Sequence, residues 1–192
     1  MSIPADRAAL QPLRRSLRQR RRALRGSERR DRERAIHAAV RALLLRRWRR
    51  IAAFEAIDGE PDLSPVLGPA LLRGRVLALP ETVHGAREPE MRFVAARADC
   101  RQLLVPPAAL DLALVPLIGF DATGNRIGFG AGYYDRAFRQ LRGRRHWRHP
   151  QLVGIAFECQ RVEALPAAPW DIPLDAIITE RGLHRFPLPK RT

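Results

Sequence analysis

The chain has 192 residues, with 35 lysines and arginines against 20 acidic residues and a formal net charge of +15. This length fits one domain that can bury a core and enclose a cleft. The two cysteines, Cys100 and Cys159, stand alone in the sequence, which argues against a disulfide framework and against a zinc site. No run approaches the roughly 18 apolar residues of a membrane span, and the N-terminus lacks the apolar stretch of a secretion signal. We therefore expect a cytoplasmic protein.

Two helices are predicted for the first 47 residues. Pro12 can open the first helix, which runs over residues 13–25 until Gly26 supplies a C-cap. Ser27 can cap the second helix, whose apolar residues recur at helical spacing. These helices carry most of the positive charge, because residues 1–50 contain 17 arginines against four acidic residues. Such a segment can bind RNA, but it equally suits a substrate with phosphate groups or several carboxylates.

From residue 51 onward, short apolar runs alternate with helical stretches. We predict strands over residues 51–56, 76–79, 91–96, 112–120, 152–157 and 176–179, and helices over 64–74 and 136–141. The run over 112–120 is typical of a central parallel strand that is covered on both faces. This alternation predicts an α/β domain with a mainly parallel sheet, whose ligands bind beyond the carboxyl ends of its strands.

A glycine-rich segment follows the longest apolar run. Its glycines occupy three alternate positions: Gly128, Gly130 and Gly132. They let successive backbone N–H groups point at one anion, Arg126 adds charge, and Asp135 at the start of a helix can hold Mg²⁺. The spacing is neither the dinucleotide fingerprint nor the P-loop. A tight strand-to-helix turn, in which Asp135 caps the helix and Tyr133 and Tyr134 pack, therefore stays open.

The stretch around these glycines resembles the signature of the 5-formyltetrahydrofolate cyclo-ligases. Residues 111–121 read DLALVPLIGFD and residues 124–136 read GNRIGFGAGYYDR. Three other stretches resemble the family in the same order: RRSLR at 14–18 is similar to its ATP-binding stretch, IDGEPD at 57–62 to its folate-contacting loop, and WDIPLDAIIT at 170–179 to its C-terminal motif. The resemblance covers about residues 11–180.

This resemblance implies a fold and an activity. The fold is a single three-layer, Rossmann-like α/β domain of the NagB/RpiA/CoA transferase-like type, with a basic helical part at 1–47 and an α/β body at 48–186. The activity is the ATP- and Mg²⁺-dependent closure of 5-formyltetrahydrofolate to 5,10-methenyltetrahydrofolate, with release of ADP and phosphate. In the family's mechanism the formyl oxygen attacks ATP to give an iminophosphate, N10 adds to the activated carbon, and phosphate leaves. We expect a monomer that binds ATP and the folate, with or without a polyglutamate tail, and neither a membrane nor nucleic acid.

The resemblance also implies roles for individual residues. Those expected at ATP are Arg14, Arg18, Arg126, Gly128, Phe129, Gly130, Ala131, Gly132, Tyr133 and Tyr134. Those expected at the folate are Glu55, Glu60, Phe129, Gly130, Ala131, Gly132 and Tyr133, with Glu60 bonded to the pterin. Arg126 and Tyr133 are the expected catalytic residues, and Asp135 is the expected Mg²⁺ ligand. Such a site works by positioning and by neutralising phosphoryl charge, so it needs no dedicated nucleophile.

Two features depart from the family pattern. Glu55 stands where the family usually has an aliphatic residue that lines the folate pocket, and a buried charge there would cost several kcal/mol unless it were paired or protonated. The segment 81–110 is short and is expected to lack the hairpin that many members carry after their Phe-containing strand. The alternative function is a family member of weakened activity that uses its first helices as a basic RNA- or nucleotide-binding module.

The arginines of the first helix separate these two functions. Arg14 and Arg18 are four residues apart and share one helical face, so removing Arg18 should weaken ATP binding by about 1 to 3 kcal/mol. Arg20, Arg21 and Arg22 point elsewhere and are predicted to be solvated, so that removing Arg21 has little effect.

Other polar residues are assigned mainly to structure. The histidines without partners at ligand spacing are His37, His146 and His149. Asp171 can approach the nucleotide or form a turn before Pro173, and both readings stay open. Glu158 and Cys159 follow a strand, where ligands bind in such sheets.

Overall fold

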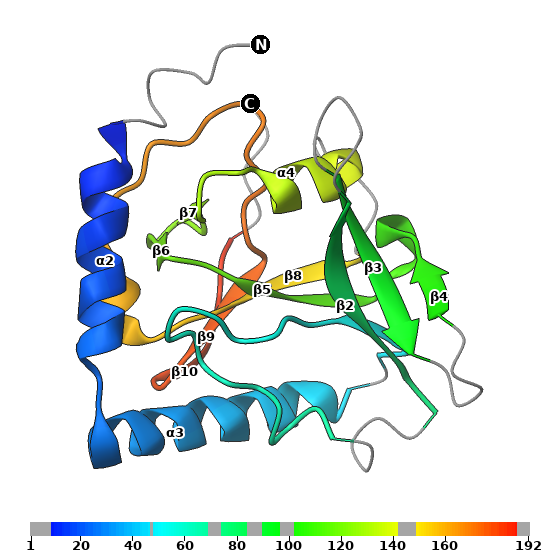
Figure 1. Ribbon diagram of the computed structural model, residues 1–192, viewed down its shortest axis with the longest axis horizontal. Helices are drawn as coiled ribbons and strands as arrows, with labels where there is room; N and C mark the ends of the chain where they lie inside the picture. The colour runs from blue at the N-terminus through cyan, green and yellow to red at the C-terminus, as the bar shows by residue number, and fades with distance from the viewer. Residues whose placement is uncertain are drawn as a thin grey trace.

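An eight-stranded mixed sheet forms the centre of the molecule (Figure 1). The computed structural model describes residues 9–46, 48–68, 74–83, 90–96, 102–141 and 149–187. Within them the strand order across the sheet is β10-β9-β8-β5-β1-β2-β3-β4. The strands are β1 (Arg50–Ala52), β2 (Val76–Val83), β3 (Glu90–Ala96), β4 (Gln102–Val105), β5 (Leu112–Pro116), β8 (Gln151–Ile155), β9 (Ala176–Thr179) and β10 (Gly182–Arg185).

The middle of the sheet is parallel and its edges are antiparallel. Strands β9, β8, β5, β1 and β2 run in one direction. Strands β10, β3 and β4 pair antiparallel with their neighbours. A separate hairpin of β6 (Gly119–Phe120) and β7 (Arg126–Ile127) follows β5. The predicted α/β fold with a mainly parallel sheet is therefore confirmed.

Helices cover both faces of the sheet. Figure 1 shows α3 (Gly26–Leu44) on one side of it and α4 (Tyr133–Ala137) on the other. The described residues also contain three short 3₁₀ helices: η1 (Pro107–Ala109), η2 (Arg139–Leu141) and η3 (Glu158–Gln160). The predicted helix over 136–141 is thus divided, because α4 begins three residues earlier and η2 follows it.

Strand β5 explains why both faces need cover. Leu112 and Leu114 belong to the apolar core that includes residues of α3, whereas Ala113 and Val115 belong to the core that includes Phe138 beside α4. Successive side chains of a strand point to opposite faces, so an unbroken apolar run is buried on both. The run ends sooner than predicted, because β5 stops at Pro116 and the chain turns into the β6–β7 hairpin.

Helix α2 (Gln11–Ala23) lies across the carboxyl ends of the central strands. Its Leu17 packs with Ile118, Ile127 and Leu165 in a small third core. The helix also contacts η3, which follows β8. Ligands of such sheets bind beyond the carboxyl ends of the strands, so α2 borders the expected site.

Both predicted helix caps at the α2–α3 junction are wrong. Helix α2 ends at Ala23, and its C-cap is Leu24, which is extended and buried in the core. Gly26 adopts a left-handed conformation with φ of 55° and is the first residue of α3, whose N-cap is Arg25. Ser27 therefore lies inside α3 and caps nothing. Burial of Leu24 sets where the chain turns, which the cap residues alone did not indicate.

Several predicted strands and loops also differ from the structure. The strand over 51–56 is confined to β1. The helix predicted from Ser64 is wrong over residues 64–68, which form a turn and a bend, and residues 69–73 lie outside the described residues. Strands β4, β7 and β10 were not predicted. A hairpin does follow Phe93, because β4 returns to pair with β3 and Val105 lies opposite Phe93, but residues 94–110 contain neither the glycine nor the Glu-Pro pair of the family's hairpin. No helix among the described residues is long and apolar enough to cross a membrane.

Candidate active site

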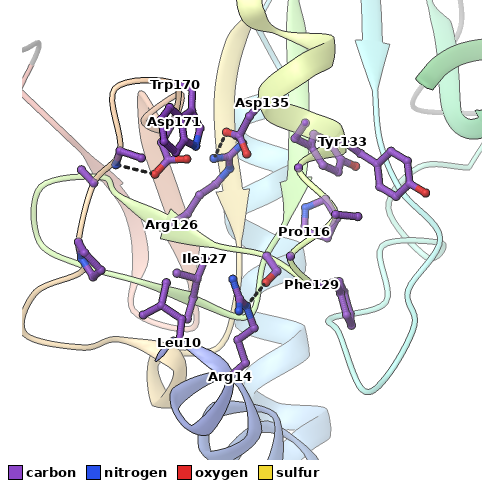
Figure 2. Close-up of a pocket in the computed structure, with 18 residues that line it drawn as sticks. Leu10, Arg14, Pro116, Arg126, Ile127, Phe129, Tyr133, Asp135, Trp170 and Asp171 are labelled. Atoms are coloured by element: carbon purple, nitrogen blue, oxygen red, sulfur yellow. Dashed lines mark hydrogen bonds and ion pairs between the residues drawn. The ribbon is translucent and has the colours of Figure 1, made fainter. Parts of the chain in front are cut away.

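A cleft of about 180 Å³ lies between α2, the glycine-rich segment and the segment 166–171 (Figure 2). Its lining residues are Leu10, Arg14, Pro116, Arg126, Ile127, Gly128, Phe129, Gly130, Ala131, Gly132, Tyr133, Tyr134, Asp135, Pro166, Ala167, Ala168, Trp170 and Asp171. All residues that were expected at ATP line it except Arg18. Sequence reasoning missed Leu10, Pro116 and the segment 166–168, which contain no chemically distinctive side chains.

The β6–β7 turn fixes the start of the glycine-rich segment. Asp121 is 2% exposed, and its Oδ1 accepts hydrogen bonds from the backbone N–H groups of Thr123 and Asn125 at 2.8 and 3.1 Å. Its Oδ2 accepts the N–H of Leu165 at 3.0 Å. Gly124 has φ of 90°, and a Cβ there would lie 2.9 Å from the carbonyl of Leu174, so only glycine fits. The turn thereby ties β7 to the segment that forms the far wall of the cleft.

Two of the three alternate glycines need their conformational freedom. Gly130 and Gly132 have φ of 101° and 68°, and Gly132 is the N-cap of α4. Gly128 is not in the left-handed region and a Cβ there would meet nothing, so the expectation is wrong for that position. Arg14 is 6% exposed and its Nε donates to the carbonyl of Gly128 at 2.9 Å. Figure 2 shows this side chain reaching from α2 to the loop.

Arg126 and Asp135 form an ion pair at the cleft. Both terminal nitrogens of Arg126 donate to Asp135 Oδ1 at 3.0 Å, and Nη1 also donates to the carbonyl of Ile172 at 3.0 Å. The N–H of Ile172 reaches the same carboxylate oxygen at 3.2 Å. Asp135 is therefore not the helix cap, which is Gly132, and the simple turn interpretation is wrong on this point. The pair joins α4 to the C-terminal motif.

Two carboxylates line the cleft and fit the requirements of Mg²⁺. This ion binds oxygen and is held through one or two carboxylates together with substrate phosphates. Asp135 lines the cleft, and the hydrogen bonds that it accepts from the described residues all go to Oδ1. Asp171 lines the cleft from the segment 166–171 and accepts the N–H of Ala168 at 2.9 Å, so the structure confirms its turn and also places it at the cleft. The described residues contain no cluster of three or more metal-binding side chains.

The two acidic residues expected at the folate differ in exposure. Glu55 is exposed, so the expected cost of a buried charge there does not arise. Glu60 is only 2% exposed and does not line the cleft. Burial raises the pKa of Glu60, although a hydrogen bond from the N–H of Ile57 and the charge of Arg21 act to lower it. Tyr134, which does line the cleft, has a pKa raised by burial and then by the charge of Glu60, so Glu60 lies just behind the cleft wall.

Arg21 is the clearest error of sequence reasoning. It was predicted to be solvated, but its side chain is fully buried and bonds Leu117 and Asp58. Arg18 turns away from the cleft: its Nε donates to Asp58 Oδ2 at 2.5 Å and its guanidinium lies 5.6 Å from the ring centroid of Phe129. Arg22 pairs with Asp58 from a more exposed position, and Arg20 is exposed as predicted. The signal was present, because Arg21 follows Leu17 by four residues and Arg14 by seven.

The remaining polar residues have structural partners. Ring nitrogens of His37 and His149 lie 2.6 and 3.2 Å from the backbone oxygens of Asp62 and Asp111. Residues 100 and 146 lie outside the described parts of the chain.

A second, shallow hollow lies beyond β8 and β9, lined by Arg32, Glu158, Cys159, Glu180 and Arg181. Arg32 pairs with Glu180, and Glu158 accepts from Arg161 at 2.5 Å. Burial, followed by the charge of Glu180, raises the pKa of the Cys159 thiol, which disfavours a reactive thiolate.

Comparisons of sequence and of structure with known proteins identify the same family. Residues 6–180 match the model of the 5-formyltetrahydrofolate cyclo-ligase family. The 5-formyltetrahydrofolate cyclo-ligase of Escherichia coli K12 is 33% identical over 147 residues, which cover 67% of this chain and 76% of that protein. The structure of a Mycoplasma pneumoniae 5,10-methenyltetrahydrofolate synthetase superposes with a TM-score of 0.74 at 29% identity, covering 91% of this chain and 99% of that one. The Aquifex aeolicus 5,10-methenyltetrahydrofolate synthetase gives 0.71 at 30% identity, covering 94% of each chain.

Proposed function

This chain belongs to the 5-formyltetrahydrofolate cyclo-ligase family and catalyses the ATP-dependent conversion of 5-formyltetrahydrofolate to 5,10-methenyltetrahydrofolate, and we propose that the cleft beside α2 is where it does so. The observation that carries this proposal is that the cleft gathers the glycine-rich segment, Arg14 and Arg126 with both Asp135 and Asp171. Arginines and backbone N–H groups bind phosphate directly, and acidic residues can bind it through a divalent cation.

In the proposed complex the phosphates of ATP lie along the glycine-rich segment. Arg14 is held against the loop by its bond to the carbonyl of Gly128, and its guanidinium also lies close to Gly130. The left-handed conformations of Gly130 and Gly132 turn the loop so that its N–H groups can face one anion. The arginines and N–H groups together neutralise phosphate charge without any nucleophilic side chain.

The residues that would hold Mg²⁺ in the proposed complex are Asp135 and Asp171, whose carboxylates line the cleft. When bound, it supplies positive charge that stabilises the phosphoryl group as the group is transferred. Arg126 is already paired with the Asp135 carboxylate. In the proposed complex the phosphate of ATP would be a second anion beside the same guanidinium. We propose that phosphate shares the guanidinium with Asp135, and that Arg126 neutralises the negative charge that grows on the transferred group.

The proposed reaction proceeds in two stages. The formyl oxygen of the folate forms a bond to the γ-phosphorus of ATP as the bond to the β–γ bridging oxygen breaks, which releases ADP and gives an iminophosphate. N10 then adds to the activated formyl carbon and loses its proton, and phosphate leaves with the former formyl oxygen and takes up that proton, which leaves the methenyl bridge. Tyr133 and Phe129 are proposed to position the folate against the γ-phosphate, because both line the cleft beside the glycines.

One assay tests this proposal. Purified protein is mixed with ATP, Mg²⁺ and 5-formyltetrahydrofolate, and the near-ultraviolet absorbance of the methenyl product is followed. We expect product that requires both ATP and the divalent cation. Absence of product at high enzyme concentration, while another cyclo-ligase works in the same buffer, would overturn the proposed function.

A further inference from the structure

The turn over residues 57–60 is held by arginines from two helices. From α2, Arg18, Arg21 and Arg22 all contact the carboxylate of Asp58. From α3, Arg29 donates to the carbonyl oxygens of Gly59 and Glu60 at 3.1 and 2.9 Å. The turn therefore receives much of the positive charge that composition alone suggested for RNA or ATP. It is the turn that presents Glu60.

Arg21 is the buried centre of this arrangement. Its side chain has no exposed surface, and each arm of its guanidinium reaches a different part of the chain. Nη1 donates to the carbonyl of Leu117, just after β5, at 3.1 Å, and lies 3.7 Å from Glu60 Oε1. Nη2 donates to the backbone oxygen and to Oδ2 of Asp58 at 2.9 and 3.0 Å. One rigid planar group thus ties the end of β5 to the turn after β1.

The turn has a backbone shape that needs such support. Asp58 has φ of 54°, which is uncommon for a residue with a side chain, and Gly59 follows with φ of 81°. Two successive left-handed residues bring Glu60 back toward the N–H of Ile57, which donates to Oε2 at 3.2 Å. The position of the Glu60 carboxylate consequently depends on contacts made by Asp58.

Glu60 has an acceptor that the described residues leave unused. Its Oε1 is buried and makes no hydrogen bond within the described part of the chain. Buried acceptors are normally satisfied, and an exception calls for a specific explanation. The pterin ring carries adjacent N–H donors that an ionised carboxylate can accept. The groups that face Glu60 are Arg21 from α2, Tyr134 from α4, Arg29 from α3 at its carbonyl, and Asp58 in its own turn.

We propose that Arg21 is a positioning residue for the folate, which holds the 57–60 turn in shape and keeps the Glu60 carboxylate ionised and oriented toward the substrate. This inference rests on the proposed function, because it takes Glu60 as the acceptor for the pterin. Arg21 itself touches neither substrate, and it acts only through Glu60 and Asp58.

The proposal predicts that replacing Arg21 weakens binding of the folate much more than binding of ATP. In Arg21→Met, the buried carboxylate of Glu60 loses its positive neighbour, so its pKa, already raised by burial, rises further. The protonated form of Glu60 then becomes more populated, and it accepts fewer hydrogen bonds than the carboxylate. We expect binding of 5-formyltetrahydrofolate to weaken roughly 10- to 100-fold at pH 7 and to recover partly as the pH is raised, while ATP binding changes less than about twofold.

The experiment measures binding of 5-formyltetrahydrofolate without ATP, and of ATP without folate, by calorimetry between pH 6 and 9. Arg20→Met is the matched control, because Arg20 is the neighbouring arginine on the same helix and is exposed. Folate binding to folded Arg21→Met that equals the wild type, or equal losses for ATP and folate, would overturn the proposal. Because no turnover is needed, a failure of the proposed function appears separately, as a wild type that binds the folate but forms no product.

Two further variants keep the test decisive if Arg21→Met does not fold. Arg21→Lys retains the positive charge but cannot make the two-armed contacts of a guanidinium. We therefore expect a smaller loss of folate affinity, again with little change in ATP affinity. Glu60→Gln combined with Arg21→Met removes both buried charges together. If Arg21 acts through Glu60, this double variant binds the folate about as weakly as Glu60→Gln alone. An additional loss in the double variant would contradict that route.

Discussion

The 57–60 turn and the glycine-rich segment both lie at the carboxyl ends of the sheet, yet they use arginine in opposite ways. At the turn, Arg21 is buried and is bonded to the protein's own carboxylate and carbonyl oxygens. At the glycine-rich segment, Arg14 and Arg126 line a cleft that a ligand can enter. The same residue type therefore holds a turn in place in one region and lines an open cleft in the other. The arginine-rich N-terminus cannot be assigned to one role from its charge alone.

Replacing Arg126 gives the largest expected effect and tests the nucleotide side of this comparison. We expect Arg126→Gln to lower kcat by about 10²- to 10³-fold, because it removes a preorganised charge from the site of phosphoryl transfer. The matched control is Arg139→Gln, which changes an exposed arginine in η2 and should leave kcat near the wild-type value. The measurement is the initial rate of methenyl formation at saturating substrates. Similar rates for both variants would mean that Arg126 only braces α4 through Asp135.

Replacing Asp58 tests whether the 57–60 turn stabilises the fold. Its side chain is 9% exposed and pairs with fully buried Arg21, so Asp58→Asn leaves a buried charge without its main partner. We expect the free energy of unfolding to fall by about 2 to 4 kcal/mol, measured by urea denaturation. Asp31→Asn is the control, because Asp31 is 59% exposed in its pair with Arg34 and such surface pairs contribute little. Equal losses in the two variants would refute the structural role of the turn.

The sequence was most informative where one local property decided the outcome. Leu112 and Leu114 lie in an apolar run that can only be a buried strand, and the glycine-rich segment was recognisable from its spacing before any contact was known. Short edge strands such as β4 and β10 escaped prediction because their residues are largely exposed and follow no strong pattern. Their existence depends on the neighbouring strand.

Residues whose role depends on tertiary contacts could not be assigned in the same way. Arg21 looked like one more solvated arginine, because the carboxylate that accepts it lies 37 residues away in the chain. Helical spacing placed it on the face of Arg14 and apolar Leu17, which was a signal that this face is covered, but the sequence did not identify the carboxylate that pairs with it. Asp171 was ambiguous for a similar reason, since only the fold brings it to the wall opposite Asp135.

Replacing Arg14 and its neighbour Arg15 one at a time tests whether the position of an arginine on α2, or only its charge, determines ATP affinity. We expect Arg14→Ala to weaken ATP binding by about 1 to 3 kcal/mol, because Arg14 lines the cleft and a charge-assisted hydrogen bond is lost. Arg15→Ala removes an equal charge from an exposed position on the same helix and should have little effect. Calorimetric titration of both variants with ATP decides between them. Equal weakening would indicate that α2 attracts ATP only through its overall charge.

The smallest expected effect is in acid stability, where one carboxyl from each region should act with opposite sign. Burial acts to raise the pKa of Asp121, but hydrogen bonds from Thr123 and Asn125 lower it more, whereas the pKa of Glu60 is raised by burial. Asp121 therefore contributes stability above its unfolded pKa of about 3.9, which is lost as the pH falls through its lower folded pKa. Glu60 does the reverse, since the folded protein holds its proton more tightly. Urea midpoints between pH 6 and 3 should fall less steeply in Asp121→Asn and more steeply in Glu60→Gln than in the wild type. Parallel curves for all three proteins would show that neither carboxyl is linked to folding.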